Sequence, residues 1–509
     1  MSEILESKIM TFLRSIIRSI KIISLCVFVI NALPATAQMM SAQSVLEDAA
    51  AAMGGLERIQ SIDSLLMTGF SQTLNQDGGS APSSHPKAPL KLAAQNGVER
   101  YFNLNELRAY QTHRQGFLFP FALAFGHAWT PSSQIQEGVN ALNHPITALR
   151  AAFDESSRLG AVSIENDNIV VQFSLEDGTT LWLGINQLNK LPAWVRWVGP
   201  HANLGELTYT TWFTGYVPFD GIRLPSGFTT DIDWRENVVT VFHVDSYELN
   251  VELPEFVSSG GGFGGGGNPE VLVTEVANGV WDLRVGSNGG AIVEFEDHLL
   301  MFEAYGNEAN SLARIDRANT LVPGKEVTQV ILSHHHFDHS GGIRAAVSRG
   351  LTIISKRENE GILREMVSRP APNFPDALAR NPQPLHFIPV DEHLILEDAS
   401  RRVDIYEVIG HMHMTDAVFA YIPEESIVMQ GDLFDIGWDW HWWGGGYMDS
   451  VEHFDLAPEI DIPVHGRVSS LNEVISNIES QVAAAREFCA RDFAVGTFMA
   501  GCPVKYSRD

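Results

Sequence analysis

Basic residues are scarce in this sequence. Its 509 residues include 34 Lys and Arg against 62 Asp and Glu, which gives a formal net charge of −28. A protein that binds nucleic acid or an anionic lipid surface needs a basic footprint to neutralise phosphates. The charge therefore excludes both as main partners and predicts an acidic, well-solvated surface.

Cysteine is also rare. The chain has three cysteines, and Cys26 lies in an N-terminal segment that we expect to be removed on export. Cys489 and Cys502 would remain, and in an oxidising compartment they could close a short loop. The sequence does not show whether they do, because a disulfide depends on geometry.

The N-terminus lacks a hydrophobic run long enough to span a bilayer comfortably, since the apolar segment Ile22–Leu33 is short. Its flanks have the pattern of a secretory signal, with basic residues before it and small residues after it: Arg14, Arg18, Lys21 and Ala35-Thr36-Ala37. We therefore expect residues 1–38 to be a signal peptide, cleaved near Gln38. The mature protein would be periplasmic or secreted, with no membrane span. An uncleaved anchor is the alternative, which Pro34 and the short run disfavour.

The length of the chain predicts two domains, because it exceeds what one hydrophobic core usually serves. The clearest boundary is the glycine-rich segment 258–269, which is typical of a flexible linker. A phosphate-binding loop would need a strand before it, a helix after it and usually a lysine, and none follows. We expect a β-rich N-terminal domain over 39–257 and a catalytic domain over 270–509.

Residues 39–257 contain a short helical segment, Ser44–Met53, followed by alternating polar and apolar segments separated by turn signals. The pair Ile169–Leu175 and Thr179–Ile185 flanks the hairpin signal Asp177-Gly178. Further strand segments have the same alternation: Ala193–Val198, Glu206–Thr214, Ile222–Ile232 and Val238–Val244. This pattern predicts an antiparallel, curved sheet.

With its opening sequence over residues 49–69, this half resembles the lipoprotein-carrier-like half-barrel of other exported proteins. The resemblance implies a separate half-barrel-like domain and makes an apolar ligand a candidate partner. The half contains no cluster of His, Cys or carboxylates that would mark a site. A structural or substrate-presenting role is favoured over a second active site.

Beyond the linker, strand segments come first and helical segments then alternate with strands. Strands are expected at Val271–Val276, Val280–Val285, Ala291–Phe295, Leu299–Phe302, Val327–Leu332, Leu351–Ile354 and Val403–Ile409. Helices are expected over Gly341–Ser348 and Ser355–Val367. The order predicts the α+β class, with two sheets and helices outside them.

The segment from Ile331 to Gly342 has the strongest chemical signal. A hydrophobic strand is followed by one turn that contains four potential metal ligands, His334, His336, Asp338 and His339. Neutral imidazoles and carboxylates are ligands that zinc prefers, and so many in one turn can be divided between two ions. A histidine-rich surface loop is the ordinary alternative, but it would not bring completing ligands downstream.

Such ligands are present at the ends of later strands. His411 and His413 follow the strand Val403–Ile409, Asp432 follows Ser426–Met429, and His465 precedes Gly466. A carboxylate such as Asp432 can bridge two cations, and a strand end is a rigid place from which to hold a ligand. The downstream residues therefore complete a candidate two-metal site.

The spacing His334-x-His336-x-Asp338-His339, followed by His413, Asp432 and His465, resembles the metallo-β-lactamase-fold hydrolase superfamily over about residues 270–480. The resemblance implies an αββα sandwich with two Zn²⁺ ions between the sheets. It assigns His334, His336 and His413 to the first metal. It assigns Asp338, His339 and His465 to the second, with Asp432 bridging.

The remaining residues of these motifs have other expected roles. His411 would contact either the ligands or the substrate, and His335 would point away from the metals. Glu303 stands where the family usually has an aspartate that supports the metal-binding turn, and whether its longer arm does the same stays open. The second metal group has no cysteine, which distinguishes it from one β-lactamase subclass.

Aromatic residues gather directly after Asp432. We expect a substrate-contacting wall there, formed by Trp438, Trp440, Trp442, Trp443 and Tyr447. The alternative is that this segment packs against the N-terminal domain. His441 and His453 are expected at the surface or in the same segment.

These observations predict an exported binuclear zinc hydrolase. Two metal ions lower the pKa of a shared water enough to supply hydroxide near neutral pH, and Asp338 is the expected catalytic residue that orients it. The sequence has no nucleophile-elbow motif that would indicate a serine hydrolase.

The metal ligands do not select a substrate, because related folds use nearly the same ones for several reactions. Export and acidity favour a small cyclic amide or ester: a β-lactam, a lactone or a related ester. A mononuclear iron dioxygenase of the persulfide-oxidising type is one alternative, although His339 and His465 exceed its needs. A ligand-binding module without catalysis is the other.

Overall fold

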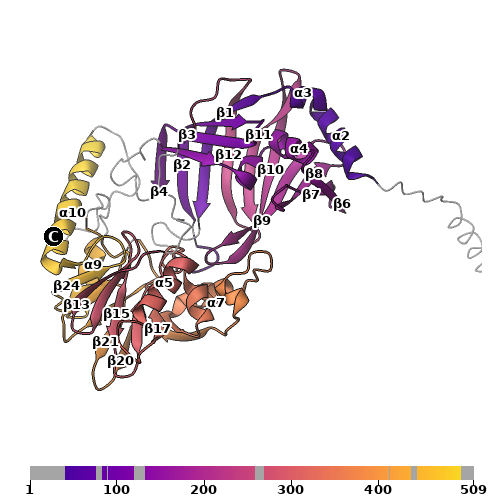
Figure 1. Ribbon diagram of the computed structural model, residues 1–509. Coiled ribbons are helices and arrows are strands. Elements are labelled where there is room, and N and C mark those ends of the chain that lie inside the picture. The colour runs from indigo at the N-terminus through magenta and orange to yellow at the C-terminus, as the bar shows by residue number, and fades with distance from the viewer. Residues whose placement is uncertain are drawn as a thin grey trace, which may run out of the picture.

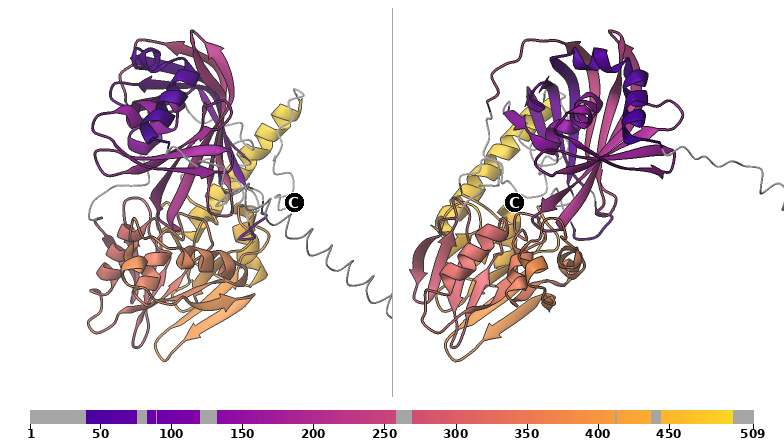
Figure 2. Two further views of the ribbon diagram at one scale, coloured as in Figure 1. Left: turned by 90° about the vertical axis from the view of Figure 1, so that its right-hand side faces the viewer. Right: turned by 45° about the vertical axis from the view of Figure 1, so that its right-hand side comes forward.

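The computed structural model describes residues 40–75, 83–88, 90–119, 132–257, 269–411, 413–436 and 444–494. We call residues 40–257 the N-terminal part and residues 269–494 the C-terminal part. Figures 1 and 2 show them as two lobes, with helix α10 (Leu471–Ala494) projecting from the C-terminal part. The expected signal peptide lies outside the described residues, as does the expected linker except for Pro269. Within the described ranges, no helix is both long and apolar enough to cross a membrane.

The N-terminal part is built on one 12-stranded sheet. Its order is β5-β3-β2-β1-β12-β11-β10-β9-β8-β7-β6, with β4 paired to β2, and the neighbours are antiparallel. The strands are β1 (Ser64–Asn75), β2 (Lys91–Asn103), β3 (Arg108–His113), β4 (Gln115–Phe119), β5 (Ser132–Gln136), β6 (Arg158–Glu165), β7 (Asn168–Ser174), β8 (Thr180–Asn186), β9 (Pro192–His201), β10 (Gly205–Phe219), β11 (Ile222–Ile232) and β12 (Val238–Leu249). The predicted antiparallel sheet is confirmed. Gly178, in the predicted hairpin turn between β7 and β8, has φ +89°, which glycine adopts without strain.

Helices pack on the inner face of this curved sheet (Figure 1). They are α2 (Ala42–Met53), α3 (Leu56–Gln60), the 3₁₀ helix η2 (Gly138–Leu142) and α4 (Pro145–Phe153). Helix α2 begins where the Ser41 hydroxyl accepts a hydrogen bond from Ser44 N, and it buries Leu46, Ala50 and Met53 along one face.

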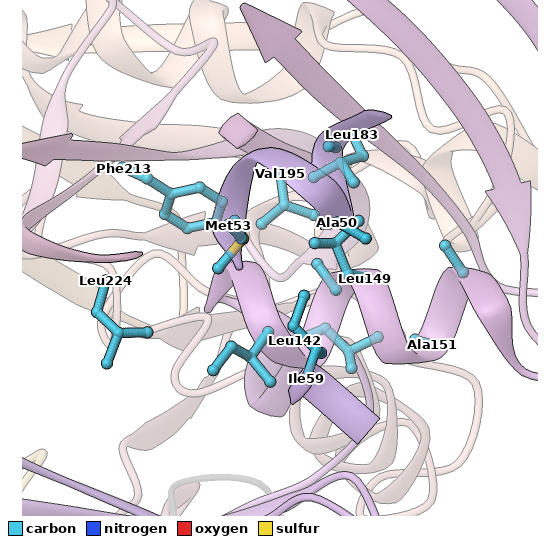
Figure 3. Close-up of a cluster of buried hydrophobic side chains, with 14 of the residues drawn as sticks. Ala50, Met53, Ile59, Leu142, Leu149, Ala151, Leu183, Val195, Phe213 and Leu224 are labelled. Carbon is cyan, nitrogen blue, oxygen red and sulfur yellow. The ribbon is translucent and has the colours of Figure 1, made fainter. Parts of the chain in front are cut away.

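Side chains of α2 and α4 meet the strands in one hydrophobic cluster. Figure 3 shows Ala50 and Met53 beside Leu149, Val195 and Phe213. These side chains occupy the inner face of the sheet near the helices. The structure therefore gives no support there to the expected apolar ligand.

The C-terminal part contains two mixed sheets. The first has the order β13-β14-β15-β16-β17-β18-β19 and the second β20-β21-β22-β23-β24-β25. The strands are β13 (Leu272–Ala277), β14 (Val280–Arg284), β15 (Ala291–Glu294), β16 (Leu299–Phe302), β17 (Val327–Ile331), β18 (Thr352–Lys356), β19 (His386–Val390), β20 (His393–Glu397), β21 (Arg402–Glu407), β22 (Val418–Ile422), β23 (Ile427–Gln430), β24 (Ile460–Pro463) and β25 (Ser469–Ser470). Strands β16 to β19 run parallel, as do β23 and β24.

Three buried clusters define four layers in this part. One cluster fills the space between the sheets, including Phe302 and Ile331 of the first and Ile405 and Met429 of the second. A second cluster packs helices on the outer face of the first sheet, and a third packs helices on the outer face of the second. The helices are α5 (Glu308–Ala318), α6 (Ile343–Ser348), η3 (Arg357–Asn359), α7 (Glu360–Ser368), α8 (Ala377–Arg380), α9 (Gly445–His453) and α10. The predicted αββα sandwich is confirmed.

Two expected helices begin later than their sequences suggested. Ser355 still belongs to strand β18, where its hydroxyl donates to Leu332 O, so the helix predicted from Ser355 starts only at η3. Helix α6 starts at Ile343, because Gly341 and Gly342 pass so close to neighbouring chain that an added Cβ would overlap it. Tertiary packing overrides local helix signals at both places.

The two parts meet along a packed interface. Leu204, Leu207 and Trp234 of the N-terminal part belong to the same buried cluster as Ile343 and Leu363 of the C-terminal part. Polar contacts join the same surfaces, for example Arg235 with Glu365 at 2.7 Å from Nε to Oε2. The two parts are therefore joined by a common hydrophobic cluster as well as by the polypeptide chain.

Candidate metal centre

The turn between β17 and α6, residues 333–340, is called the metal loop below. Four backbone contacts fix its shape: Ser333 N donates to Glu303 Oε1 at 2.9 Å, Val418 N to Ser333 O at 2.8 Å, Gly306 N to Asp338 O at 2.6 Å and His339 N to His336 O at 3.1 Å. Strand β17 enters the loop from the core, so its histidines lie buried. The loop is thus held by two other segments of the C-terminal part, residues 303–306 and the start of β22, and by one hydrogen bond of its own.

A first group of potential ligands combines the metal loop with two later segments. His334, His336, His413 and Asp432 each place one ligand atom within 4.8 Å of the others. His413 Nε2 lies 2.9 Å from Asp432 Oδ2, and His334 Nε2 lies 3.7 Å from the same oxygen. Residues separated by almost a hundred positions thus meet at one point.

A second group shares Asp432 with the first. It consists of Asp338, His339, Asp432 and His465, again with ligand atoms within 4.8 Å. Asp432 Oδ1 lies 3.1 Å from His339 Nε2 and 3.2 Å from His465 Nε2. His465 Nε2 is also 3.3 Å from Asp338 Oδ2. Asp432 therefore faces one group with each oxygen, as a bridging carboxylate must.

Strand topology explains this convergence. Strand β23 ends directly before Gly431 and Asp432, and its parallel neighbour β24 ends before His465. The carboxyl ends of parallel strands lie at one edge of a sheet, and the metal loop leaves β17 at the facing edge of the other sheet. The site thus lies at one rim of the sandwich.

The pKa values of three of these groups, His334, His336 and Asp432, are shifted in the direction that favours binding of a cation. Burial lowers the pKa of His334 and His336 well below the usual value, so both imidazoles are neutral. Burial alone would raise the pKa of Asp432, but the charges of His339 and His465 outweigh it and hold the pKa well below its usual value. In return, Asp432 and Asp338 raise the pKa of His339 against the effect of burial. The carboxylates therefore attract positive charge to the centre of the cluster.

Glu303 takes the supporting position that the sequence left open. It is fully buried at the end of β16 with φ +74°, and its Oε1 accepts the hydrogen bond from Ser333 N. The same oxygen lies 3.6 Å from His339 Nδ1. The longer side chain thus reaches both the backbone and a ligand of the metal loop.

His411 lies beside the ligands and braces them. Its Nδ1 accepts a hydrogen bond from His413 N at 3.3 Å, and its Nε2 donates to Leu433 O at 3.1 Å. Burial lowers its pKa to about 3, so the ring is neutral. Of the two roles expected for His411, these contacts favour the support of ligands over contact with substrate. His335 is buried and belongs to neither ligand group, as expected.

The aromatic wall is only partly visible. Trp438, Trp440, Trp442, Trp443 and His441 lie outside the described residues. Tyr447, expected to contact substrate, is fully buried, and its hydroxyl donates to Asp461 Oδ1 at 2.7 Å. That prediction is wrong, because Tyr447 belongs to the apolar cluster between the second sheet and helices α9 and α10. His453 lies at the end of α9 and is exposed, as expected.

Two residues that position ligands carry almost no recognisable signal in the sequence. Asn288 Oδ1 accepts a hydrogen bond from His465 Nδ1 at 2.8 Å, which leaves Nε2 facing the second group. Ser333 Oγ lies 2.8 Å from His334 Nδ1. Asn288 stands in a glycine-rich turn, where asparagine is common for backbone reasons alone. Only the fold brings it to His465.

Comparison with known families agrees with this geometry. Residues 291–437 match the family model of the metallo-beta-lactamase superfamily. The resemblance inferred from the histidine and aspartate motifs is thereby confirmed. The matched segment contains the metal loop, His413 and Asp432, whereas His465 and the N-terminal part lie outside it.

Solved metallo-beta-lactamases are similar to this chain. The enzyme from Pontibacter korlensis is 14% identical, with 42% of this chain and 99% of that chain covered and a TM-score of 0.34. FIM-1 from Pseudomonas aeruginosa, in a mono-zinc form, is 18% identical, with 42% and 96% covered and a TM-score of 0.34. The protein from Hirschia baltica is 16% identical, with 42% and 97% covered and a TM-score of 0.33. No curated protein matches the sequence.

Proposed function

We propose that this protein is a metal-dependent hydrolase that holds two zinc ions at the rim of its C-terminal sandwich. One observation carries the proposal: two groups of potential ligand atoms share Asp432, one through each of its oxygens. His334, His336 and His413 would hold the first ion. Asp338, His339 and His465 would hold the second.

The donor set fits such ions. His334 Nε2 and His336 Nε2, both of the first group, are buried without a hydrogen-bond partner among the described residues. Buried polar atoms in proteins are normally paired, so two unpaired nitrogens in one group need an explanation. Neutral imidazole and ionised carboxylate are ligands that suit Zn²⁺, and the pKa shifts of His334, His336 and Asp432 produce these forms.

Bound zinc would supply Lewis acidity and lower the pKa of a water toward neutrality. Asp338 is suited to act on that water, because its side chain is 38% exposed whereas the neighbouring His339 is fully buried. Before a metal binds, burial would raise its pKa, but the charge of His339 and a hydrogen bond from His465 outweigh burial and lower it. A bound cation would favour the ionised carboxylate in the same way. The ionised carboxylate can therefore accept a hydrogen bond from water and orient it toward a substrate carbonyl.

The substrate we propose is a small cyclic amide or ester, such as a β-lactam, a lactone or a related ester. The matched family supports hydrolysis in general, and the signal-like N-terminus supports a periplasmic or extracellular substrate. The net charge of −28 disfavours polyanionic substrates.

Metal analysis followed by a turnover screen tests this proposal. We expect about two zinc ions per chain, and hydrolysis of at least one compound among chromogenic lactams, acyl-lactones and aryl esters. His336→Ala should abolish hydrolysis. His453→Ala, which removes an exposed histidine that belongs to neither ligand group, is the matched control.

Other outcomes would favour other functions. One iron per chain would indicate the mononuclear dioxygenase instead. A zinc-loaded protein that hydrolyses none of these compounds would favour a binding module without catalysis.

A further inference from the structure

The turn between β9 and β10 in the N-terminal part reaches the metal loop. Figure 1 shows β9 extending from the upper lobe toward the lower one. Leu204 in the turn and Leu207 in β10 are buried with core residues of the C-terminal part. Arg369 holds the turn by donating to Leu204 O at 3.2 Å and to Glu206 O at 3.0 Å. The turn is therefore attached to the C-terminal part by both apolar packing and hydrogen bonds.

Asn203 lies at the tip of this turn and is 1% exposed. Its Nδ2 donates to Phe337 O at 3.0 Å and to Ser340 Oγ at 2.8 Å. Its own backbone N donates to His201 Nδ1 at 3.3 Å, which fixes the turn locally. Both hydrogens of the amide are thus directed to the metal loop.

These two contacts enclose two ligands of the second group. Asp338 and His339 are the residues between Phe337 and Ser340. Ser340 Oγ, which accepts from Asn203, in turn donates to His336 O at 2.8 Å and so links the two ends of the segment 336–340. One amide therefore holds the segment 337–340 at both of its ends, which restricts the movement of Asp338 and His339 between them.

Aromatic packing from the N-terminal part also restrains Phe337, the residue before Asp338. The Phe337 ring lies 5.2 Å from the ring of His201 and 5.5 Å from that of Trp234, measured between centroids. Both rings belong to the N-terminal part. The segment that precedes Asp338 is therefore clamped between the two parts.

We propose that Asn203 is a positioning residue that sets the places of Asp338 and His339, so that the N-terminal part completes the second metal-binding group. The inference rests on the proposed function, because it concerns the same pair of ions. It gives the N-terminal part a role at the active site: that part supplies the outer support of the metal loop. Groups that orient metal ligands typically contribute 10- to 100-fold in metal affinity.

The two metal groups should respond differently. In the first group, Ser333 and Glu303 anchor His334, and His413 and Asp432 come from other segments. Its fourth member, His336, meets the Asn203 contacts only through the hydrogen bond from Ser340 Oγ to its backbone carbonyl. The second takes two of its four members from the segment that Asn203 holds. Loss of Asn203 should therefore weaken the second ion far more than the first.

Zinc titration of the metal-free full chain tests this. In Asn203→Ala, the first ion should bind within about twofold of the original affinity and the second at least about tenfold more weakly. Asn203→Asp keeps the size of the side chain but removes both donors, so it should show the same loss. Absorption spectra recorded as a first and then a second equivalent of cobalt is added give another readout, and the bands gained with the second equivalent should fall selectively in both variants.

Asn373→Ala is the matched control. It removes an amide at the same interface, where Asn373 Nδ2 donates to Glu206 Oε1 at 2.9 Å without touching the metal loop. It should leave both affinities unchanged. Circular dichroism and thermal midpoints identify any variant that loses its fold, and the isosteric Asn203→Asp is then the decisive one.

The outcomes separate the inference from the function beneath it. If the original protein binds two ions and folded Asn203 variants bind both unchanged, the inference is refuted while the proposed function stands. Equal weakening in Asn373→Ala would also refute it, because the effect would then belong to the interface in general. If the original protein binds no divalent ion, the proposed function fails and the inference fails with it.

Discussion

The contact between Asn288 and His465 allows a sharp test of how the second metal group is tuned. Asn288 Oδ1 accepts the hydrogen bond from His465 Nδ1, which fixes the ring so that Nε2 faces Asp432 and Asp338. Asn288→Ala removes this acceptor. The ring then loses both its fixed orientation and its preferred tautomer.

The size of the effect follows from burial. Such supporting contacts contribute between 10- and 100-fold in metal affinity. Asn288 is half-buried in its turn, so water can replace part of the lost hydrogen bond. We therefore expect the low end, about tenfold weaker binding of the second ion, which equals about 1.4 kcal/mol.

Asn288→Asp should act in the opposite direction. A carboxylate in place of the amide increases the basicity of the imidazole and tightens the metal bond at neutral and alkaline pH. The same carboxylate favours the protonated imidazole, and a proton on Nε2 must leave before a metal binds. The gain should therefore shrink as the pH falls.

Isothermal titration with zinc across a pH series measures the affinity for the second ion, which should rise from Asn288→Ala to the original protein to Asn288→Asp at alkaline pH. The reasoning is refuted if Asn288→Ala binds the second ion as tightly as the original protein. It is also refuted if Asn288→Asp weakens binding at alkaline pH as much as the alanine variant does. Ser287→Ala, next in the same turn, is the control, because its backbone carbonyl and not its hydroxyl contacts Arg284.

Three further predictions concern stability. Asp416→Ala removes the acceptor of hydrogen bonds from Ser84 N and Ser84 Oγ, so urea denaturation should show a loss of about 1–3 kcal/mol; an unchanged midpoint would contradict it. Burial lowers the pKa of His144 to about 3, so the stability that its neutral ring provides is complete above about pH 6.5 and lost as the pH falls toward 3. His144→Asn keeps an acceptor for Ile146 N, and its unfolding free energy should fall less steeply with acid, by up to about 1.4 kcal/mol per pH unit. Chelators should lower the thermal midpoint reversibly, since zinc at about 100 times its Kd adds about 2.7 kcal/mol, and a midpoint insensitive to chelation and zinc would contradict a folded-state metal site.

The structure brings together the residues proposed as ligands from the sequence, because they follow hydrophobic strands. Strand signals before His334, Asp432 and His465 place these residues at strand ends, and parallel strands bring such ends together. The spacing within the metal loop adds a motif that the family comparison bears out. Local patterns and one topological rule thus suffice for the ligand groups.

The supporting residues follow no local pattern. Asn203 and Asn288 stand in turns, where asparagine is expected for its backbone preferences alone. Their amides reach the site only because two sheets and two parts of the chain come together. Tyr447 shows the reverse error, because proximity in sequence to Asp432 suggested the substrate side, whereas helix α9 turns its ring into the core.

Gly431 shows how closely the site is packed. An added Cβ at this position would overlap Ser333 Oγ and lie 3.0 Å from Glu303 Oε1. Those two residues hold the metal loop, and the next residue, Asp432, has φ +62°. A non-glycine residue in that region is held at a cost of about 1–3 kcal/mol, which the surroundings must offset. The close passage of Gly431 lets the strand that presents the shared carboxylate touch the loop that presents the histidines, so one small residue sets the distance between the two ligand sources.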